Sequence, residues 1–130
     1  MRVIAILVAA AAIVLGACTT RGHPIYNVEK APIILPPGKS ASMTQVSTAI
    51  MRAGSRLGWV MNPEAPGRIT GRINVKNILA VIDVEHDTKS YSIKYRDSSG
   101  LNAESGTIHQ RYNNWIHNLD KNIRAELTGL

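Results

Sequence analysis

Two segments with helical periodicity enclose a stretch in which apolar and polar residues alternate, and this order constrains the fold more than any other feature. Over 68–76, apolar side chains alternate with charged and polar ones, as in a strand with one buried face. Such patterns predict strands over 59–61, 68–76, 78–85 and 90–96, and helices over 40–57 and 107–127. Each amphipathic helix has to cover an apolar surface. The sequence therefore predicts an α+β fold: an antiparallel sheet of three to four strands with two helices packed on one face, a two-layer sandwich.

Composition limits the kinds of site that the chain can hold. Its 130 residues favour one domain, and its single cysteine excludes a disulfide scaffold and a zinc site built on cysteines. Two of its four histidines, His109 and His117, lie two turns apart on the second predicted helix, about 12 Å along the axis. Because that separation is too large for both to bind one metal ion, we predict no metal and no cofactor.

The N-terminal segment has the pattern of a secretory signal peptide over residues 1–17. Arg2 precedes an uncharged apolar run from Val3 to Ala17, which is shorter than the roughly 20 residues of a membrane-spanning helix. The run ends in Leu15-Gly16-Ala17-Cys18, which resembles the lipobox of bacterial lipoproteins. This resemblance implies cleavage before Cys18, a diacylglycerol on its thiol and a fatty acid such as palmitate on its new amine. The alternative is an uncleaved signal anchor in which Cys18 is inert.

The residue after the cysteine bears on the location of the protein. Thr19 stands where aspartate would signal retention in the inner membrane of a Gram-negative host. By the same resemblance, the chain is therefore expected on the periplasmic face of the outer membrane, anchored by lipid at Cys18. This address excludes nucleic acid as a partner.

The chain is predicted to divide into a signal peptide over 1–17, a lipidated tether over 18–39 and a single α+β periplasmic domain over 40–130. Within the tether, an edge strand over 24–28 is one alternative, and it leaves a free linker of at most about 18 Å. Without that strand, the linker reaches residue 39 and extends to about 70 Å. The two alternatives place the domain against the membrane or well away from it.

An excess of basic residues raises the hypothesis of an acidic partner. The chain has 15 lysines and arginines against 9 aspartates and glutamates. Alternation puts five cations on the polar sides of two predicted strands: Arg68, Arg72, Lys76, Lys94 and Arg96. If those sides coincide, the cations form a basic patch for an anionic envelope component or an envelope protein. The simpler interpretation is a solvated face that keeps the protein soluble.

Further binding candidates concentrate polar and aromatic character in the second half of the chain. They are Tyr91, Tyr95, Asp97, Ser98, His109 and Asn113. Because a tyrosine ring has one polar end, it suits either a groove or a core without phenylalanine. We assign Tyr91 or Tyr95 to a groove, and Tyr112 and Trp115 to the core.

A catalytic set is conceivable from Asp97, Ser98 and His109, provided that the fold brings the three side chains together. Serine and aspartate are also the ordinary residues of turns, and the chain has many serines. We therefore predict no catalytic residue.

Two strings in this half of the chain are fairly specific: YSIKYRDS over 91–98 and IHQRYNNWIHNL over 108–119. Together with the stretch 49–61, they resemble a set of small proteobacterial outer-membrane lipoproteins. The resemblance implies a periplasmic, lipid-anchored α+β domain, and it brings neither an activity nor a role for any residue.

These observations predict a lipid-anchored protein of the bacterial envelope that binds or scaffolds another envelope component and is not an enzyme. One alternative is an inhibitor or accessory subunit of an envelope enzyme or secretion complex. The other is a small cell-wall hydrolase that uses Asp97, Ser98 and His109.

Overall fold

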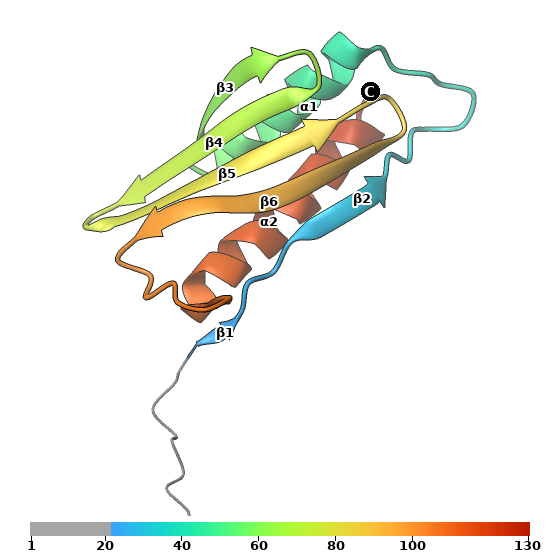
Figure 1. Ribbon diagram of the computed structural model, residues 1–130. Coiled ribbons are helices and arrows are strands. Elements are labelled where there is room, and N and C mark those ends of the chain that lie inside the picture. The colour runs from blue at the N-terminus through green and yellow to red at the C-terminus, as the bar shows by residue number, and fades with distance from the viewer. Residues whose placement is uncertain (1–21) are drawn as a thin grey trace, which may run out of the picture.

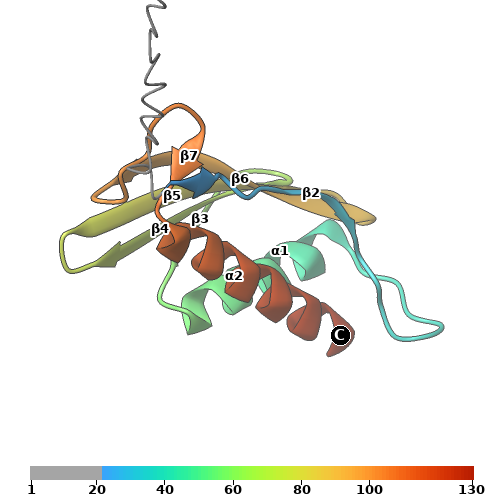
Figure 2. The same cartoon turned by 90° about the horizontal axis from the view of Figure 1, so that it is seen from below.

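Both helices pack on one face of a five-stranded antiparallel sheet of order β2-β6-β5-β4-β3, and a two-stranded sheet, β1-β7, lies at one end (Figure 1). The computed structural model describes residues 22–130, so the predicted signal peptide and Cys18 lie outside the described residues. The strands are β1 (His23–Pro24), β2 (Val28–Pro32), β3 (Val60–Ala65), β4 (Arg68–Val75), β5 (Ile78–His86), β6 (Ser90–Ser99) and β7 (Thr107–Ile108), and the helices are α1 (Met43–Arg56) and α2 (Gln110–Thr128). Figure 2 shows both helices on the same side, which leaves the opposite face of the sheet without a helix.

The central strands β4, β5 and β6, which the alternating patterns predict as strands, form an antiparallel meander. In β4, Ile69 and Ile73 are buried whereas Arg72 is exposed. Strand β6 continues to Ser99, past the predicted end at residue 96, and the pairing with β5 shifts by one residue there. This β-bulge leaves Arg96 without a residue directly opposite it on β5.

The prediction of three to four strands is wrong, because the large sheet has five strands and two further segments form a second sheet. The missed strand β2 and the extended part of β3 are edge strands that contain proline, Pro32 and Pro63. Proline removes a backbone donor and hides the usual pattern, but an edge strand tolerates it. In β2 the alternation is also interrupted at Lys30, whose φ is +47°. In place of one edge strand over 24–28, β1 and β2 flank that segment.

The helices begin at polar caps. For α1, the Ser42 hydroxyl accepts a hydrogen bond from the Gln45 backbone N–H at 3.1 Å, and the Gln45 side chain accepts one from the Ser42 N–H at 2.9 Å. This reciprocal capping box agrees with the predicted start of the first helix. Helix α2 begins later than predicted, because residues 107–108 pair as β7 and His109 is the N-cap.

The core lies between the sheet and the two helices and contains two fully buried tyrosines, Tyr91 and Tyr112. Trp59 is buried as well, and its ring meets that of Trp115 edge to face, with centroids 6.4 Å apart. The assignment of Tyr112 to the core is therefore correct, and Trp115 packs against the core while partly exposed. These rings replace the phenylalanines that the chain lacks.

The segment after residue 22 is part of the fold from its first residues. His23 and Pro24 pair with Ile108 and Thr107, and the Ile25 N–H donates to the Gly106 carbonyl at 3.0 Å. Strand β2 then runs along β6 as the outer strand of the large sheet. Figure 1 shows β1 at the end of the molecule where α2 begins, with the C-terminus at the other end.

Candidate functional site

One face of the large sheet has no helix over it (Figure 2) and is here called the open face. The strand register arranges its polar and apolar side chains in rows across the strands. The first row consists of Val60, Arg72, Val81 and Asp97, from β3 to β6 in register. The second row consists of Asn62, Thr70, Asp83 and Lys94. Residues in register on neighbouring strands lie side by side, so each row is a line of adjacent side chains.

A hollow of about 630 Å³ lies over these rows. Its lining residues are Val60, Asn62, Glu64, Thr70, Arg72, Val81, Arg96 and Asp97. Val81 is only 5% exposed, and it does not belong to the core between the sheet and the helices. It forms the apolar floor of the hollow on the open face. The volume is within the range of small-molecule sites, which are about 300–1,000 Å³. Its two arginines and two carboxylates make the hollow formally neutral.

Arg96, at the bulge, is held by neighbours on three strands. Its guanidinium lies 3.5 Å from the Asp83 carboxylate and 3.8 Å from that of Glu64, and it donates to the Thr70 hydroxyl at 3.5 Å. Arg96 therefore already has two carboxylates and one hydroxyl among its neighbours within the protein.

Two other charged side chains of the hollow, Arg72 and Asp97, have no oppositely charged neighbour of this kind in the described part of the chain. Within residues 22–130, neither Arg72 nor Asp97 forms an ion pair. One carboxylate oxygen of Asp97 accepts a hydrogen bond from the Ser98 N–H at 2.8 Å. Arg72 and Asp97 are separated by Val81 on the strand between them. The hollow therefore presents one free guanidinium and one free carboxylate on opposite sides of an apolar floor.

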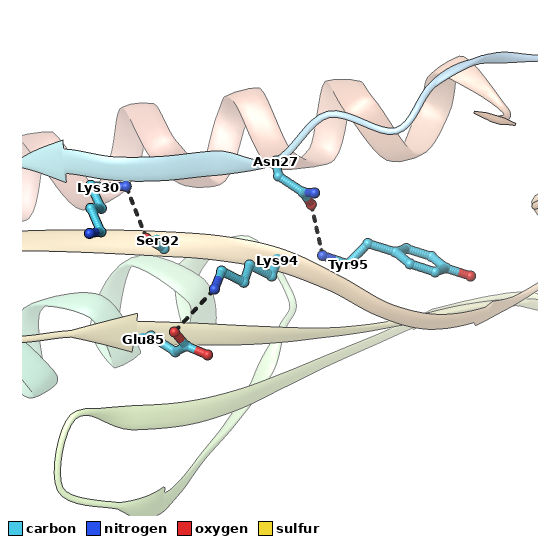
Figure 3. A network of polar contacts seen from close by, with 6 residues as sticks. All are labelled: Asn27, Lys30, Glu85, Ser92, Lys94 and Tyr95. Carbon is cyan, nitrogen blue, oxygen red and sulfur yellow. Dashed lines mark hydrogen bonds and ion pairs between the residues drawn. The ribbon is translucent and has the colours of Figure 1, made fainter. Parts of the chain in front are cut away.

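The structure does not gather the five predicted cations into a basic patch. Acidic side chains of β5 stand between those of β4 and β6: Lys94 pairs with Glu85 at 3.3 Å, as Figure 3 shows, and Arg96 lies beside Asp83. Arg68 is in register with Glu85, and Lys76 lies in the turn after β4, with φ at +56°. The predicted alternation of the two basic strands is confirmed, but alternation within a strand does not indicate which strand lies between them.

The two tyrosines assigned to a groove lie on the helix side of the sheet. Tyr91 is buried, so its assignment to a groove is wrong, and its hydroxyl donates to the Asp120 carboxylate. Burial, together with this hydrogen bond to a carboxylate, raises the pKa of Tyr91. Tyr95 is partly buried against Tyr112, and its hydroxyl lies 2.8 Å from that of Ser98. Both rings therefore serve packing between the sheet and α2.

Within the described part of the chain, His109 forms no hydrogen bond with Asp97 or Ser98, and Asp97 contacts Ser98 only through the Ser98 backbone N–H, at 2.8 Å. Ser98 bonds to the Tyr95 hydroxyl, and the His109 ring nitrogen Nδ1 accepts from the Arg111 N–H at 3.0 Å as a helix cap. Each side chain thus has a separate structural partner, and the geometry gives no support to a catalytic set made of these three.

Asn113 connects α2 to the segment between β1 and β2. Its amide oxygen accepts a hydrogen bond from the Tyr26 N–H at 3.0 Å, and its NH₂ group donates to the Pro24 carbonyl at 2.9 Å. The Tyr26 ring stacks on His117 with centroids 4.0 Å apart. Asn27 continues the attachment by accepting from the Tyr95 N–H at 2.9 Å (Figure 3). The role of Asn113 is therefore to fix this segment.

Sequence reasoning missed a close hydroxyl–imidazole pair, Ser47 on α1 and His86 at the end of β5. The Ser47 Oγ lies 2.7 Å from the His86 Nε2, and the other ring nitrogen lies 3.3 Å from the Asp87 carbonyl oxygen. His86 is 8% exposed, and a backbone carbonyl stands where a carboxylate would orient a catalytic imidazole. We interpret the pair as an attachment of α1 to the sheet. No local sequence signal could reveal it, because the two residues are 39 positions apart.

Within residues 22–130, no three histidine, cysteine, aspartate or glutamate side chains cluster as metal ligands would. Neither α1 nor α2 combines the length and apolarity of a membrane-crossing helix.

Comparisons with known proteins give no relatives for this chain. No protein-family model, no curated protein and no solved structure matches it. A function for this chain therefore has to be argued from its sequence and from the geometry of residues 22–130.

Proposed function

We propose that this chain is a lipid-anchored, non-catalytic binding module of the bacterial envelope, attached at Cys18 to the periplasmic face of the outer membrane. The observation that carries the proposal is the docking of the chain into the fold from His23 onward, directly after the lipobox. The lipidation itself rests on the sequence of residues 1–18.

The short distance between anchor and fold determines where the module works. Cys18 and His23 are separated by five peptide steps, which span at most about 18 Å when fully extended. The paired strands β1 and β7 would therefore stay next to the membrane surface. A chain acylated two or three times binds a bilayer firmly, because each buried CH₂ contributes about 0.8 kcal/mol.

The attachment of the segment after His23 is distributed over several contacts. Asn113 binds it on one side, and the Lys30 N–H donates to the Ser92 hydroxyl at 2.9 Å further along (Figure 3). The Ile33 N–H then bonds to the Lys89 carbonyl at 2.8 Å. These bonds favour the shorter of the two predicted linkers and disfavour one that reaches residue 39.

The open face supplies the binding surface. The hollow over its rows contains the uncompensated Arg72 and Asp97, whereas the other face of the sheet is occupied by helices. A role as an inhibitor or accessory subunit is a special case of this proposal in which the partner is an envelope protein.

Mass spectrometry of the intact protein tests the anchor. We expect the mature chain to lack residues 1–17 and to carry two or three acyl chains on Cys18, and we expect Cys18→Ser to lose all acyl mass. A full-length, unacylated chain in the membrane fraction would mean a signal anchor and would contradict the proposal.

Site-specific photo-crosslinking in intact cells tests the binding surface. A crosslinker at Asn62, on the open face, should give discrete adducts, and a crosslinker at the exposed Arg52 of α1 is the matched control. Adducts from Arg52 alone would assign the binding surface to the helices and remove the open face from the proposal.

A further inference from the structure

We propose that the hollow on the open face binds a short peptide with free amino and carboxyl termini. The peptide lies across Val81, with its carboxylate on the Arg72 guanidinium and its ammonium group on the Asp97 carboxylate. This inference rests on the binding role proposed above and names the chemical class of its ligand.

The charge of the hollow selects a zwitterion over an anion. Two arginines and two carboxylates line it, and Asp83 lies beside Arg96 as a further acidic group. A dianion such as phosphate would meet carboxylates on the same surface, and like charges disfavour binding. A ligand that carries one charge of each sign finds a partner for both and leaves no charge unpaired.

The orientation of the ligand follows from which charged side chains of the hollow have no partner among the described residues. Arg96 is engaged by Glu64, Asp83 and Thr70, so it stiffens the wall of the hollow. Arg72 forms no ion pair in the described part of the chain and offers the planar fork of donors that suits a carboxylate. Asp97 retains an oxygen for an ammonium group, since one oxygen is bonded to the Ser98 N–H.

The register sets the length of the ligand. Arg72, Val81 and Asp97 stand opposite one another on three adjacent strands. Strands are about 4.8 Å apart, so the Cα atoms of Arg72 and Asp97 are separated by about 10 Å. The charges of a single α-amino acid are too close together to span this gap. Two or three residues, at about 3.5 Å each, bring the two termini to the two side chains.

The surroundings of the row suit the middle of a peptide. Val81 and the 61% exposed Val60 offer apolar contacts to small side chains. Asn62 lies in the next row, and its amide forms no side-chain hydrogen bond in the described residues, so it is free to bond to a peptide group.

Tri-alanine is the probe, titrated into the full chain in detergent micelles and followed by the NMR signals of the valine methyl groups. We expect saturable shifts at Val81 and Val60, with a dissociation constant on the order of 1 mM for a ligand of this size. Arg72→Gln and Asp97→Asn should each weaken binding about tenfold. The matched controls Lys121→Gln on α2 and Glu29→Gln on β2 remove exposed charges elsewhere and should leave binding unchanged.

Blocked peptides and a charge exchange make the test specific. N-acetyl-tri-alanine and tri-alanine amide should bind about tenfold more weakly than the free peptide. The double variant Arg72→Asp with Asp97→Lys should recover binding that each single change loses, because the peptide can then lie in the reverse direction. A merely structural role of these residues would not produce such recovery.

Several outcomes would overturn the inference. They are the absence of saturable binding up to about 20 mM, equal binding of the blocked peptides, and tighter binding of inorganic phosphate at the same residues. None of these depends on acylation. If they occurred while crosslinks from Asn62 persisted, the peptide would be the wrong ligand class and the binding module would remain.

Discussion

Replacing Tyr91 with phenylalanine is expected to destabilise the fold, whereas the same replacement at Tyr112 is expected to leave it as stable or more stable. Both rings are buried, at 1% and 0% exposure, so the two substitutions remove one oxygen atom from similar surroundings. The difference lies in what each hydroxyl contacts. That of Tyr91 donates to the Asp120 carboxylate, and that of Tyr112 is buried without a hydrogen-bond partner in the described residues.

The magnitudes follow from these contacts. A hydrogen bond to a charged group contributes about 1.5–3 kcal/mol to stability. Arg124 would still bond to Asp120 in the variant, at 3.2 and 3.3 Å, so we expect Tyr91→Phe to cost about 2 kcal/mol. An unpaired buried hydroxyl costs about 1–3 kcal/mol, so Tyr112→Phe should be neutral or gain about 1 kcal/mol. The two variants should thus differ by about 2–3 kcal/mol, or on the order of 10 °C in Tm.

Urea unfolding, followed by the fluorescence of the two tryptophans, measures this difference. The slope of the free energy of unfolding against urea should match in all variants, so that only the midpoint changes. Tyr26→Phe is the control, because its ring is partly exposed on His117, and we expect a change within about 0.5 kcal/mol. A neutral Tyr91→Phe together with a Tyr112→Phe that costs more than about 1 kcal/mol would refute the reasoning.

At alkaline pH the fold should lose stability, because burial raises the pKa of both fully buried tyrosines. These groups stay protonated in the folded state while they ionise in the unfolded chain. Their contribution to the free energy of unfolding is therefore complete below about pH 10 and falls above it by about 1.4 kcal/mol per pH unit for each tyrosine. Urea midpoints between pH 9 and 11 measure this slope, and each phenylalanine variant should reduce it. Gly67→Ala should cost at least about 1 kcal/mol more than Gly38→Ala. Both glycines have positive φ, but only at Gly67 would a Cβ meet a backbone atom, the His86 carbonyl oxygen at 2.6 Å, and equal thermal shifts would argue against this. Asn113→Ala should expose the Tyr26 N–H to hydrogen exchange, because its acceptor at 3.0 Å is removed, and unchanged protection would show that other contacts suffice.

Local patterns were sufficient for the elements that pack on both sides of the core. The alternation of Ile69 and Ile73 with polar residues, and the serine cap before α1, are properties of short segments. The spacing of apolar residues in such a segment allows only one kind of secondary structure to bury its apolar side, so that structure follows from the sequence. The edge strands were not predicted in full, because Pro32 and Pro63 interrupt the alternating pattern. These segments are strands because they pair with a neighbouring strand, and not because one side of them is buried.

The candidate site depended on strand order. The sequence identified Arg72 and Arg96 as candidates on two separate predicted strands, and Asp97 as a candidate just after the second of them. That β5 lies between those strands, and brings Val81 and Asp83 to the same face, is a matter of sheet topology. The bulge that turns Arg96 toward Glu64 is equally invisible in a one-dimensional pattern.

The sequence by itself determined the two helices and the three central strands, because each depends on the spacing of residues along a short segment. Tertiary structure alone decided that the segment after His23 is docked, that Tyr91 is buried, and that the cations alternate with acids on the open face. The physical reason is that charge compensation and burial depend on neighbours across strands, and those neighbours are set by long-range pairing that no local period encodes.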